Sequence, residues 1–211
     1  VMAEVAEISY ELIKAGEEKE IVEFIRNYFL KDEPLNNSLD LGECKELEIF
    51  STESLCENVS FKAVRNGEIL GVMINGIVHK HSEAPHTDFS GHEKFQKIIT
   101  LSENLEHQCG IFERFPEIER YVDGRIMSVS SQARGLGIAG RLVEETLSHM
   151  GKENLPLIYI QCSSFYSARV LEKLNFEEIL SLRYEDYRLE GKPVFTPEKP
   201  HENIKIFIKR I

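Results

Sequence analysis

The glycine-rich hexapeptide GLGIAG, residues 135–140, constrains the fold of this 211-residue chain more than any other feature. It follows a short strand-like segment, residues 125–130, and leads into a helical stripe of Ile138, Leu142, Thr146 and Met150. Glycines let the backbone approach a ligand closely, and a helix N-terminus presents unpaired amides with a partial positive charge. The junction therefore predicts a phosphate-binding loop.

Two ligand classes use such a loop. Gly135, Gly137 and Gly140 form the G-x-G-x-x-G pattern of dinucleotide-binding folds, whereas residues 132–137, QARGLG, form a Q-x-x-G-x-G pattern that binds the pyrophosphate of coenzyme A. The dinucleotide fingerprint normally follows the first strand and precedes an acidic residue about 20 residues further on. Here the loop lies past the middle of the chain, and the next strand ends in residues 161–163, QCS, without a carboxylate. The pattern favours coenzyme A.

The remaining hydrophobic periodicity predicts one α/β domain, residues 1–211, with a mixed sheet. Asn66-Gly67 is a preferred type I′ turn, so residues 61–78 read as a hairpin. Further strands are expected at 8–13, 156–164, 176–187 and 203–211, and helices at 15–29, 93–115 (one or two), 138–150 and 167–174. Pro34 should end the first of these helices, Gly151 the third and Asn175 the fourth. Residues 35–57 show no clear pattern, and residues 79–92 read as a loop.

Charge and cysteine spacing narrow the possible partners. The formal net charge of −11 argues against nucleic acid and anionic membranes. The four cysteines are widely spaced, so we expect reduced thiols and no metal site. The N-terminal residues lack the pattern of a signal peptide, and no apolar run approaches the roughly 20 residues that span a bilayer. We expect a cytoplasmic monomer that acts on a small molecule.

Several segments together resemble a known family. Residues 132–137, QARGLG, and 167–176, SARVLEKLNF, are similar to the acetyl-CoA core of the GCN5-related N-acetyltransferase (GNAT) superfamily, over about residues 125–176. Residues 29–36, FLKDEPLN, 134–144, RGLGIAGRLVE, and 162–178, CSSFYSARVLEKLNFEE, resemble the insect-type arylalkylamine (dopamine-like) N-acetyltransferases. The resemblance implies the GNAT fold, a central mixed and splayed β-sheet flanked by helices.

The resemblance also implies where acetyl-CoA binds. The strand backbone at Met127 and Val129 would pair with the pantetheine arm, and a backbone N–H of this strand would meet the oxyanion. The side chains of Gln132, Arg134 and Lys173 would assist binding. Backbone amides would hold the pyrophosphate, and they belong to Arg134, Gly135, Leu136, Gly137, Ile138, Ala139 and Gly140.

Acetyl transfer requires a neutral amine. An alkylamine with a pKa of about 10.4 is neutral in only about one part in 10³ at pH 7, so the site needs a base. A glutamate such as Glu33 is in general most often solvated, but the resemblance assigns it the role of base, for which burial must raise its pKa or a water must relay the proton. The tyrosine that many GNAT enzymes use as acid is replaced by Leu171. The resemblance points instead to Ser163 and Ser167, which could share one helix face. Ser163 is the more expected helix cap, and Ser167 the more expected participant in catalysis.

Three other features have competing interpretations. Cys162 could form an acetyl-cysteine intermediate, but no histidine partner is evident, and a buried small side chain is the favoured interpretation. The histidines at 79, 81, 86 and 92 could bind metal, but no known ligand spacing supports this. Phe24, Tyr28 and Phe29 could line an aryl pocket or simply fill the core.

The resulting expectation is direct acetyl transfer from acetyl-CoA to a small arylalkylamine such as dopamine, serotonin or tyramine, within a ternary complex. One alternative is an acetyltransferase for a non-aryl amine, such as a polyamine, a hydrazine-like amine or a protein lysine. The other is a non-catalytic acyl-CoA-binding module, which the missing tyrosine at Leu171 favours.

Overall fold

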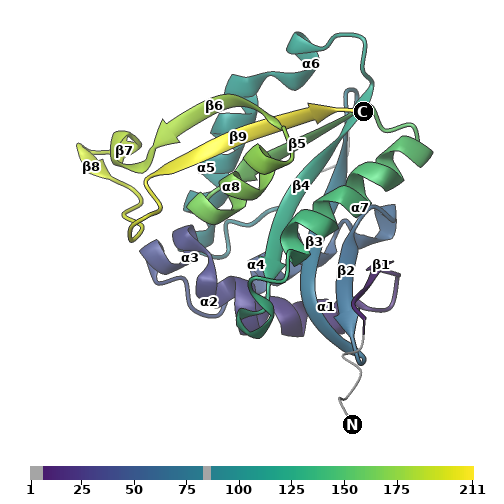
Figure 1. Ribbon diagram of the computed structural model, residues 1–211. Coiled ribbons are helices and arrows are strands. Elements are labelled where there is room, and N and C mark those ends of the chain that lie inside the picture. The colour runs from purple at the N-terminus through teal and green to yellow at the C-terminus, as the bar shows by residue number, and fades with distance from the viewer. Residues whose placement is uncertain (1–6, 83–86) are drawn as a thin grey trace.

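A seven-stranded mixed sheet forms the centre of the protein, as expected for the GNAT fold (Figure 1). The computed structural model describes residues 7–82 and 87–211. The strand order is β1-β2-β3-β4-β5-β9-β6, and the β4–β5 pair is parallel while the other neighbours are antiparallel. The strands are β1 (Ser9–Leu12), β2 (Phe61–Arg65), β3 (Glu68–His79), β4 (Arg120–Val129), β5 (Leu157–Cys162), β6 (Glu177–Arg183) and β9 (Asn203–Arg210), with a separate hairpin of β7 (Arg188–Leu189) and β8 (Lys192–Pro193).

Helices cover both faces of this sheet (Figure 1). One face carries α7 (Ile138–Lys152) and α8 (Phe165–Lys173), whose apolar residues form a buried cluster with β3, β4 and β5. The N-terminal helices and α5 (Glu93–Cys109) pack on the opposite face, where they form two further clusters. The other helical segments are α1 (Glu18–Phe24), the π-helical η1 (Ile25–Phe29), α2 (Leu30–Asp32), α3 (Pro34–Leu39), α4 (Lys45–Thr52), η2 (Leu55–Glu57), α6 (Ile111–Arg114), η3 (Ser131–Ala133) and η4 (Tyr184–Asp186).

The tightest predicted turn is confirmed. Asn66 and Gly67 have φ angles of 54° and 77°, as a type I′ turn requires, and they join β2 to β3. The predicted helical region 93–115 is two helices, α5 and α6, which meet at Gly110 with φ 51°. Residues 35–57, which had no clear pattern, contain α3, α4 and η2. In each of these short helices the apolar side chains are too few to show a period.

The predicted helix end at Gly151 is wrong. Helix α7 continues through Gly151 to Lys152, and Asn154 takes the left-handed conformation with φ 53°. Leu155 N–H then bonds to Met150 O (3.0 Å), and the Leu155 side chain is buried. This is a Schellman motif with asparagine at C′, which satisfies the last carbonyls as glycine would have done one turn earlier.

Asn175 does end α8 as predicted, with φ 57° and a bond from Phe176 N–H to Leu171 O (3.1 Å). The helix begins at Phe165, two residues before the predicted start, because Ser164 caps it. The Ser164 Oγ accepts a hydrogen bond from Ser167 N–H (3.0 Å). The expectation that Ser163 is the cap is therefore wrong.

Strands β4 and β5 diverge. In the described part of the chain they pair only at Val122–Ile158, Asp123–Tyr159 and Gly124–Ile160, although β4 continues to Val129. A bulge lies at the point of divergence, because Ile126 faces Ile74 and Gly124 faces Asn75, which leaves Arg125 without a partner in β3. The segment 126–129 is thus paired with β3 on one side and open toward the gap on the other.

Candidate active site

Glu33 lies at the junction between α2 and α3. Pro34 prevents the preceding residue from taking the α conformation, so Glu33 is extended at ψ 128° and ends the N-terminal helical run. It then acts as N-cap of α3, where Oε2 accepts a hydrogen bond from Asn36 N–H (2.6 Å). The predicted termination before Pro34 is confirmed. The same Glu33-Pro34 sequence ends α2, begins α3 and fixes the position of the Glu33 carboxylate.

The Glu33 carboxyl group is buried, with 8% of the residue exposed. Burial raises its pKa because the charged form loses hydration, and hydrogen bonds from Ser163 and from the amides of Asn36 and Leu35 oppose this in part. Glu33 is therefore not a solvated helix-end acid. The raised pKa makes it a better proton acceptor than an ordinary carboxylate.

Glu33 lines a cavity of about 100 Å³ between the sheet and the N-terminal helices. Most of the wall is apolar, with three phenylalanine rings, Phe29, Phe50 and Phe95, from three different helical segments. Of the three aromatics considered in the sequence, Phe29 lines this cavity, whereas Phe24 packs in the core against Tyr28 with 4.9 Å between ring centroids. An apolar cavity with a few polar groups is the usual form of a small-molecule site.

The two candidate serines occupy different environments. Ser163 lines the cavity beside Glu33. Ser167 lies in the first turn of α8, where its hydroxyl donates to Ser164 O (3.0 Å) and contacts the Cys162 thiol. The expectation that they share one helix face is wrong, because Ser163 precedes the Ser164 cap and lies outside the helix.

Tyr184 holds the main chain at Ser163. Its buried hydroxyl donates to Ser163 O (2.6 Å), and neither periodicity nor motif pointed to this residue. Burial, and to a smaller extent the nearby Glu33 carboxylate, raise the pKa of the Tyr184 hydroxyl. The hydroxyl therefore stays protonated and remains a hydrogen-bond donor.

We expect Tyr184→Phe to leave Ser163 O unsatisfied. This hydrogen bond is partly buried, and a typical intramolecular hydrogen bond contributes about 0.5–1.5 kcal/mol, so the free energy of unfolding in urea should fall by that amount. Tyr187→Phe, in the same segment but only half-buried, is the matched control. An unchanged unfolding free energy in Tyr184→Phe would contradict this role.

The predicted pyrophosphate loop is open to solvent. Gly135 and Gly137 have φ angles of 78° and 73°, and a Cβ placed on either, or on Gly140, would have nothing within 4 Å. The first intrahelical bond of α7 joins Arg141 N–H to Gly137 O (3.1 Å), so the amides before Arg141 have no partner within the helix. An open cavity of about 540 Å³ lies beside the loop, lined in part by Leu136, Gly137 and Gly140. The open glycine loop with its free amides suits a diphosphate.

The other predicted coenzyme-binding residues lie before the loop, within it or at the end of α8. Met127 and Val129 lie on the diverging part of β4, opposite Met73 and Gly71 of β3. Gln132 and Lys173 are exposed, the first in η3 and the second at the end of α8. Arg134 forms an exposed ion pair with Asp32 (3.0 Å), which links the loop to the residue before Glu33. Ile138 and Ala139 begin α7.

Cys162 points away from the Glu33 cavity. It is buried in the cluster under α7 and α8, and burial raises its thiol pKa to about 12. A thiol that remains protonated is a poor nucleophile. The favoured interpretation, a buried small side chain, agrees with this environment.

We accordingly expect Cys162→Ala to retain coenzyme A release within about threefold of the unmodified chain, at a stability cost of about 1 kcal/mol for the small cavity. Intact-mass measurement after incubation with acetyl-CoA should show no stable acetyl adduct at this position. Loss of turnover in a folded Cys162→Ala variant, or an adduct that the substitution removes, would support the acetyl-cysteine route instead.

The histidine loop does not form a metal-ligand group in the part that the structure describes. His79 ends β3, and the His92 ring accepts a hydrogen bond from Phe95 N–H (3.2 Å) as the cap of α5. His86 lies outside the described residues. Within residues 7–82 and 87–211, no three His, Cys, Asp or Glu side chains come together to hold a metal ion.

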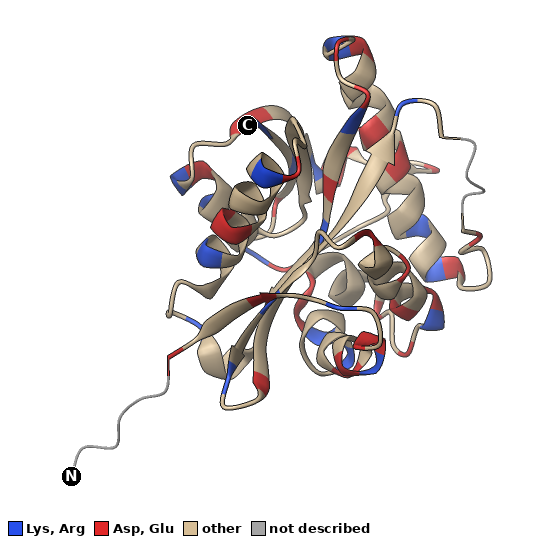
Figure 2. Ribbon diagram, turned by 90° about the vertical axis from the view of Figure 1, so that its right-hand side faces the viewer, with Lys and Arg blue, Asp and Glu red and all other residues tan. Residues whose placement is uncertain are grey.

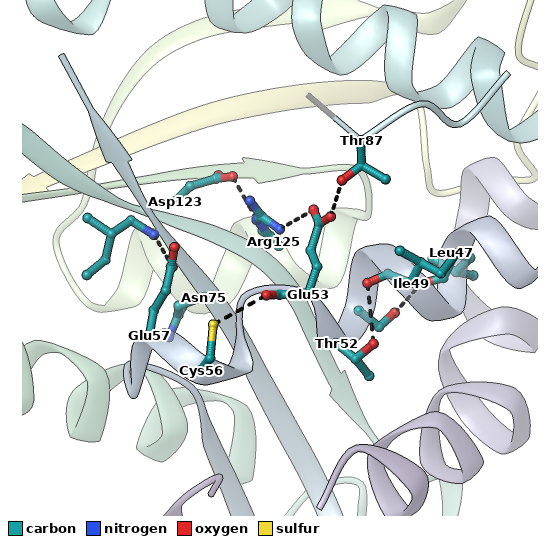
Figure 3. A network of polar contacts seen from close by, with 12 residues as sticks. Leu47, Ile49, Thr52, Glu53, Cys56, Glu57, Asn75, Thr87, Asp123 and Arg125 are labelled. Carbon is teal, nitrogen blue, oxygen red and sulfur yellow. Dashed lines mark hydrogen bonds and ion pairs between the residues drawn. The ribbon is translucent and has the colours of Figure 1, made fainter. Parts of the chain in front are cut away.

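A second polar group in the cavity was not anticipated from the sequence. Asp123 and Arg125 line it from β4, and Arg125 lies between Asp123 (3.5 Å) and Glu53 (2.8 Å) (Figure 3). Burial raises the Asp123 pKa to about 6, and Arg125 opposes this rise. The signal that the sequence offers for Asp123 and Arg125 is their alternation with apolar residues in β4. The same alternation is typical of a strand with one solvated face, so it does not by itself indicate a site.

Comparison with solved structures identifies the family. An arylalkylamine N-acetyltransferase 2 from Aedes aegypti superposes with a TM-score of 0.88 at 30% sequence identity, covering 97% of this chain and 99% of that one. The chain belongs to the GNAT superfamily, and within it to the insect arylalkylamine N-acetyltransferase type. A scan against protein-family models gives no match.

Two further structures share the fold. A polyamine N-acetyltransferase from Drosophila melanogaster, which forms N-acetylagmatine, has a TM-score of 0.86 at 24% identity, covering 97% of this chain and 100% of that one. A mosquito arylalkylamine N-acetyltransferase like 5b has a TM-score of 0.83 at 21% identity, with the same coverage. As an N-acetyltransferase of this type, the protein differs from many GNAT enzymes at Leu171, which is buried in the core.

Two further observations concern the charge of the surface and the possibility of membrane spans. Acidic and basic residues are interspersed over the helices and strand ends (Figure 2). No helix in the described ranges combines the length and the apolar character needed to cross a bilayer.

Proposed function

We propose that this protein transfers an acetyl group from acetyl-CoA to a small arylalkylamine, by direct attack in a ternary complex. The observation that carries the proposal is the buried Glu33 carboxylate at the wall of an apolar, phenylalanine-lined cavity. The open glycine loop and the diverging strands β4 and β5 support a coenzyme site next to that cavity. We also propose that residues 1–211 act as one catalytic domain, in the cytoplasm and as a monomer.

Glu33 acts as the base in this proposal. It accepts a proton from the bound ammonium, and the resulting neutral amine attacks the thioester carbonyl carbon. A backbone N–H of the open β4 segment at Met127–Val129 donates to the oxyanion that forms. The C–N bond forms and the C–S bond then breaks, so that the electron pair leaves with the coenzyme A sulfur.

The two serines assist at different steps of this transfer, Ser163 at the deprotonation of the amine and Ser167 at the departure of the sulfur. Ser163 donates to the Glu33 carboxylate and can relay its proton. Ser167 supplies a hydroxyl near the end of β5, where it can hydrogen-bond the departing sulfur. Serine is a far weaker acid than a thiol, so a hydrogen bond or a relay, rather than net donation, is the role proposed for both.

Residues around the loop would hold the coenzyme. Amides of residues 134–140 would bind the pyrophosphate, and Met127 and Val129 would pair with the pantetheine arm. Gln132, Arg134 and Lys173 would add side-chain contacts. Their exposure leaves them free to do so.

A second acceptor class is favoured by one observation, namely the second carboxylate, Asp123, in the same cavity. A diamine could place one cation at each carboxylate. The Drosophila melanogaster enzyme of the same fold is a polyamine N-acetyltransferase that forms N-acetylagmatine.

A competition experiment tests the proposal. The protein is incubated with acetyl-CoA and an equimolar mixture of tyramine, spermidine and a lysine-containing peptide, and the products are identified by mass. The expected product is N-acetyltyramine. Predominant acetylspermidine or acetylpeptide would replace the aryl acceptor with a non-aryl one, and no product with intact acetyl-CoA binding would indicate a binding module.

A further inference from the structure

Gln161 lies at the point where the two central strands separate. The pairing of β4 with β5 ends at Gly124–Ile160, and Gln161 is the next residue of β5. Side chains alternate along a strand, and Tyr159, two residues earlier, belongs to a buried cluster on the face that α5 covers. The Gln161 side chain points to the same face and lines the acceptor cavity together with Glu33.

The orientation of the Gln161 carboxamide is fixed. Its Nε2 donates to the main-chain oxygen of Ser102 on α5 (3.0 Å) and to the Tyr159 hydroxyl (2.9 Å). A main-chain oxygen only accepts hydrogen bonds, so the nitrogen of the carboxamide, and not its oxygen, must face Ser102. The Tyr159 hydroxyl in turn contacts the Cys109 thiol. Both N–H groups of Gln161 are thus in use.

The Gln161 oxygen is unpaired and accessible. Within residues 7–82 and 87–211, Oε1 accepts no hydrogen bond, yet it does not belong to the buried polar atoms that lack a partner. The side chain is half-buried and lines the cavity, so the space that Oε1 faces is that of the cavity. The acceptor site therefore contains an uncharged oxygen whose direction is set by the two bonds of Nε2.

The spacing along the chain brings this oxygen within reach of an amine bound at Glu33. Ser163, whose hydroxyl donates to the Glu33 carboxylate, follows Gln161 by two residues, a rise of about 7 Å in an extended chain. One nitrogen with two hydrogen bonds of about 2.9 Å joins oxygen atoms up to about 6 Å apart. A single amino group can therefore contact Glu33 and Gln161 together.

We propose that Gln161 Oε1 accepts a hydrogen bond from the amino nitrogen of the acceptor and holds that nitrogen between Glu33 and the gap between β4 and β5. An alkylammonium has three N–H donors, and Glu33 receives the proton of one of them. Gln161 accepts a second hydrogen bond without taking a proton, so the nitrogen keeps its position when it becomes neutral and attacks the thioester. This inference rests on the proposed function and adds to it the residue that orients the nucleophile.

Gln161→Met and Gln161→Glu test the contact. Both side chains are close to glutamine in length and lack the two N–H groups that bond to Ser102 and Tyr159, but only glutamate keeps an acceptor oxygen. At pH 7 with tyramine, Gln161→Met should lower kcat/KM by about 10- to 100-fold, which corresponds to the loss of a hydrogen bond to a charged group. Gln161→Glu should exceed Gln161→Met by about tenfold, because one of its oxygens accepts in either protonation state.

Two controls accompany these kinetics. The dissociation constant for acetyl-CoA, measured by calorimetry, should be the same in both variants and in the unmodified enzyme, because the glycine loop before α7 is unaltered. Gln108→Met makes the same chemical change at an exposed position of α5 and is the matched control, for which the kcat/KM of the unmodified enzyme is expected.

Three results would overturn the inference and leave the proposed function intact. An unchanged kcat/KM in Gln161→Met would show that the oxygen does not contact the amine. Equal losses in the two variants would assign the effect to the bonds that join Gln161 to Ser102 and Tyr159. Weaker acetyl-CoA binding in Gln161→Met would assign the side chain to the coenzyme site or to the fold. No turnover of tyramine by the unmodified enzyme would overturn the proposed function and this inference together.

Discussion

Glu33→Gln is expected to lower kcat/KM for an arylalkylamine by about 10²- to 10⁴-fold at pH 7, because the amide cannot accept the ammonium proton. Glutamine keeps an oxygen that can accept the Asn36 N–H bond, so the cap of α3 is retained. The deficit should be largest at low pH, where free amine is scarcest, and should narrow as the amine itself deprotonates. Steady-state kinetics from pH 6 to pH 10 measure this.

The same substitution should stabilise the fold at neutral pH. Because the folded-state pKa of Glu33 is raised, the folded protein binds this proton more tightly than the unfolded chain does. Its contribution to stability therefore declines as pH rises from the unfolded pKa through the raised folded value, and glutamine removes that loss. The urea midpoint of Glu33→Gln at pH 7 should exceed that of the unmodified protein, and the advantage should disappear at low pH.

Glu23→Gln, an exposed change on α1, is the matched control for both measurements and should alter neither. Glu33→Ala removes the cap as well and should lose about 1 kcal/mol relative to Glu33→Gln. If Glu33→Gln kept the activity and pH profile of the unmodified enzyme, Glu33 would not be the base.

Gly137→Ala is expected to weaken acetyl-CoA binding by about 10- to 100-fold, which corresponds to the loss of one or two hydrogen bonds to a charged group. Gly137 has φ 73° and is the residue before α7, so a Cβ there is strained and stands where a pyrophosphate would approach. Isothermal titration calorimetry with acetyl-CoA measures the dissociation constant directly.

Gly191→Ala separates strain from binding. Gly191 has a similar φ of 79° in the β7–β8 turn, and a Cβ there also meets nothing within 4 Å. Both variants should lose about 1–2 kcal/mol of unfolding free energy, but only Gly137→Ala should lose affinity. Equal affinity in the two variants would remove this loop from the coenzyme site.

The parts of the fold that the sequence predicted are those in which one local signal determines the structure. The Asn66-Gly67 turn, the helix break at Pro34 and the left-handed Asn175 each follow from backbone sterics at one or two residues. The glycine loop and α7 followed from glycine spacing and from a stripe long enough to show its period. The mixed sheet and its flanking helices are confirmed.

The predictions that were wrong concern positions at which two nearby residues can each end or cap a helix. Gly151 and Asn154 can both end a helix, and Ser163 and Ser164 can both cap one. The buried Leu155 accompanies the end at Asn154, and the hydrogen bond from Ser167 N–H makes Ser164 the cap. Residues 35–57 were unclear because their helices are shorter than the window in which a period is visible.

The second polar group of the cavity required the tertiary structure. Asp123 and Arg125 line the same cavity as Glu33 because β4 and β5 diverge after Gly124 and the N-terminal helices cover that face. Glu53, which anchors Arg125, is 72 residues away in the chain. No local pattern in one sequence links these positions, whereas the resemblance at residues 29–36 pointed to Glu33, whose role as base stays a prediction.

Coenzyme A release, followed with a thiol reagent at pH 7 under saturating acetyl-CoA with tyramine as the acceptor, tests the central claim most directly. The account predicts sustained turnover that depends on tyramine and yields one N-acetylated product per coenzyme A released. Tight binding of acetyl-CoA without amine-dependent release would contradict it.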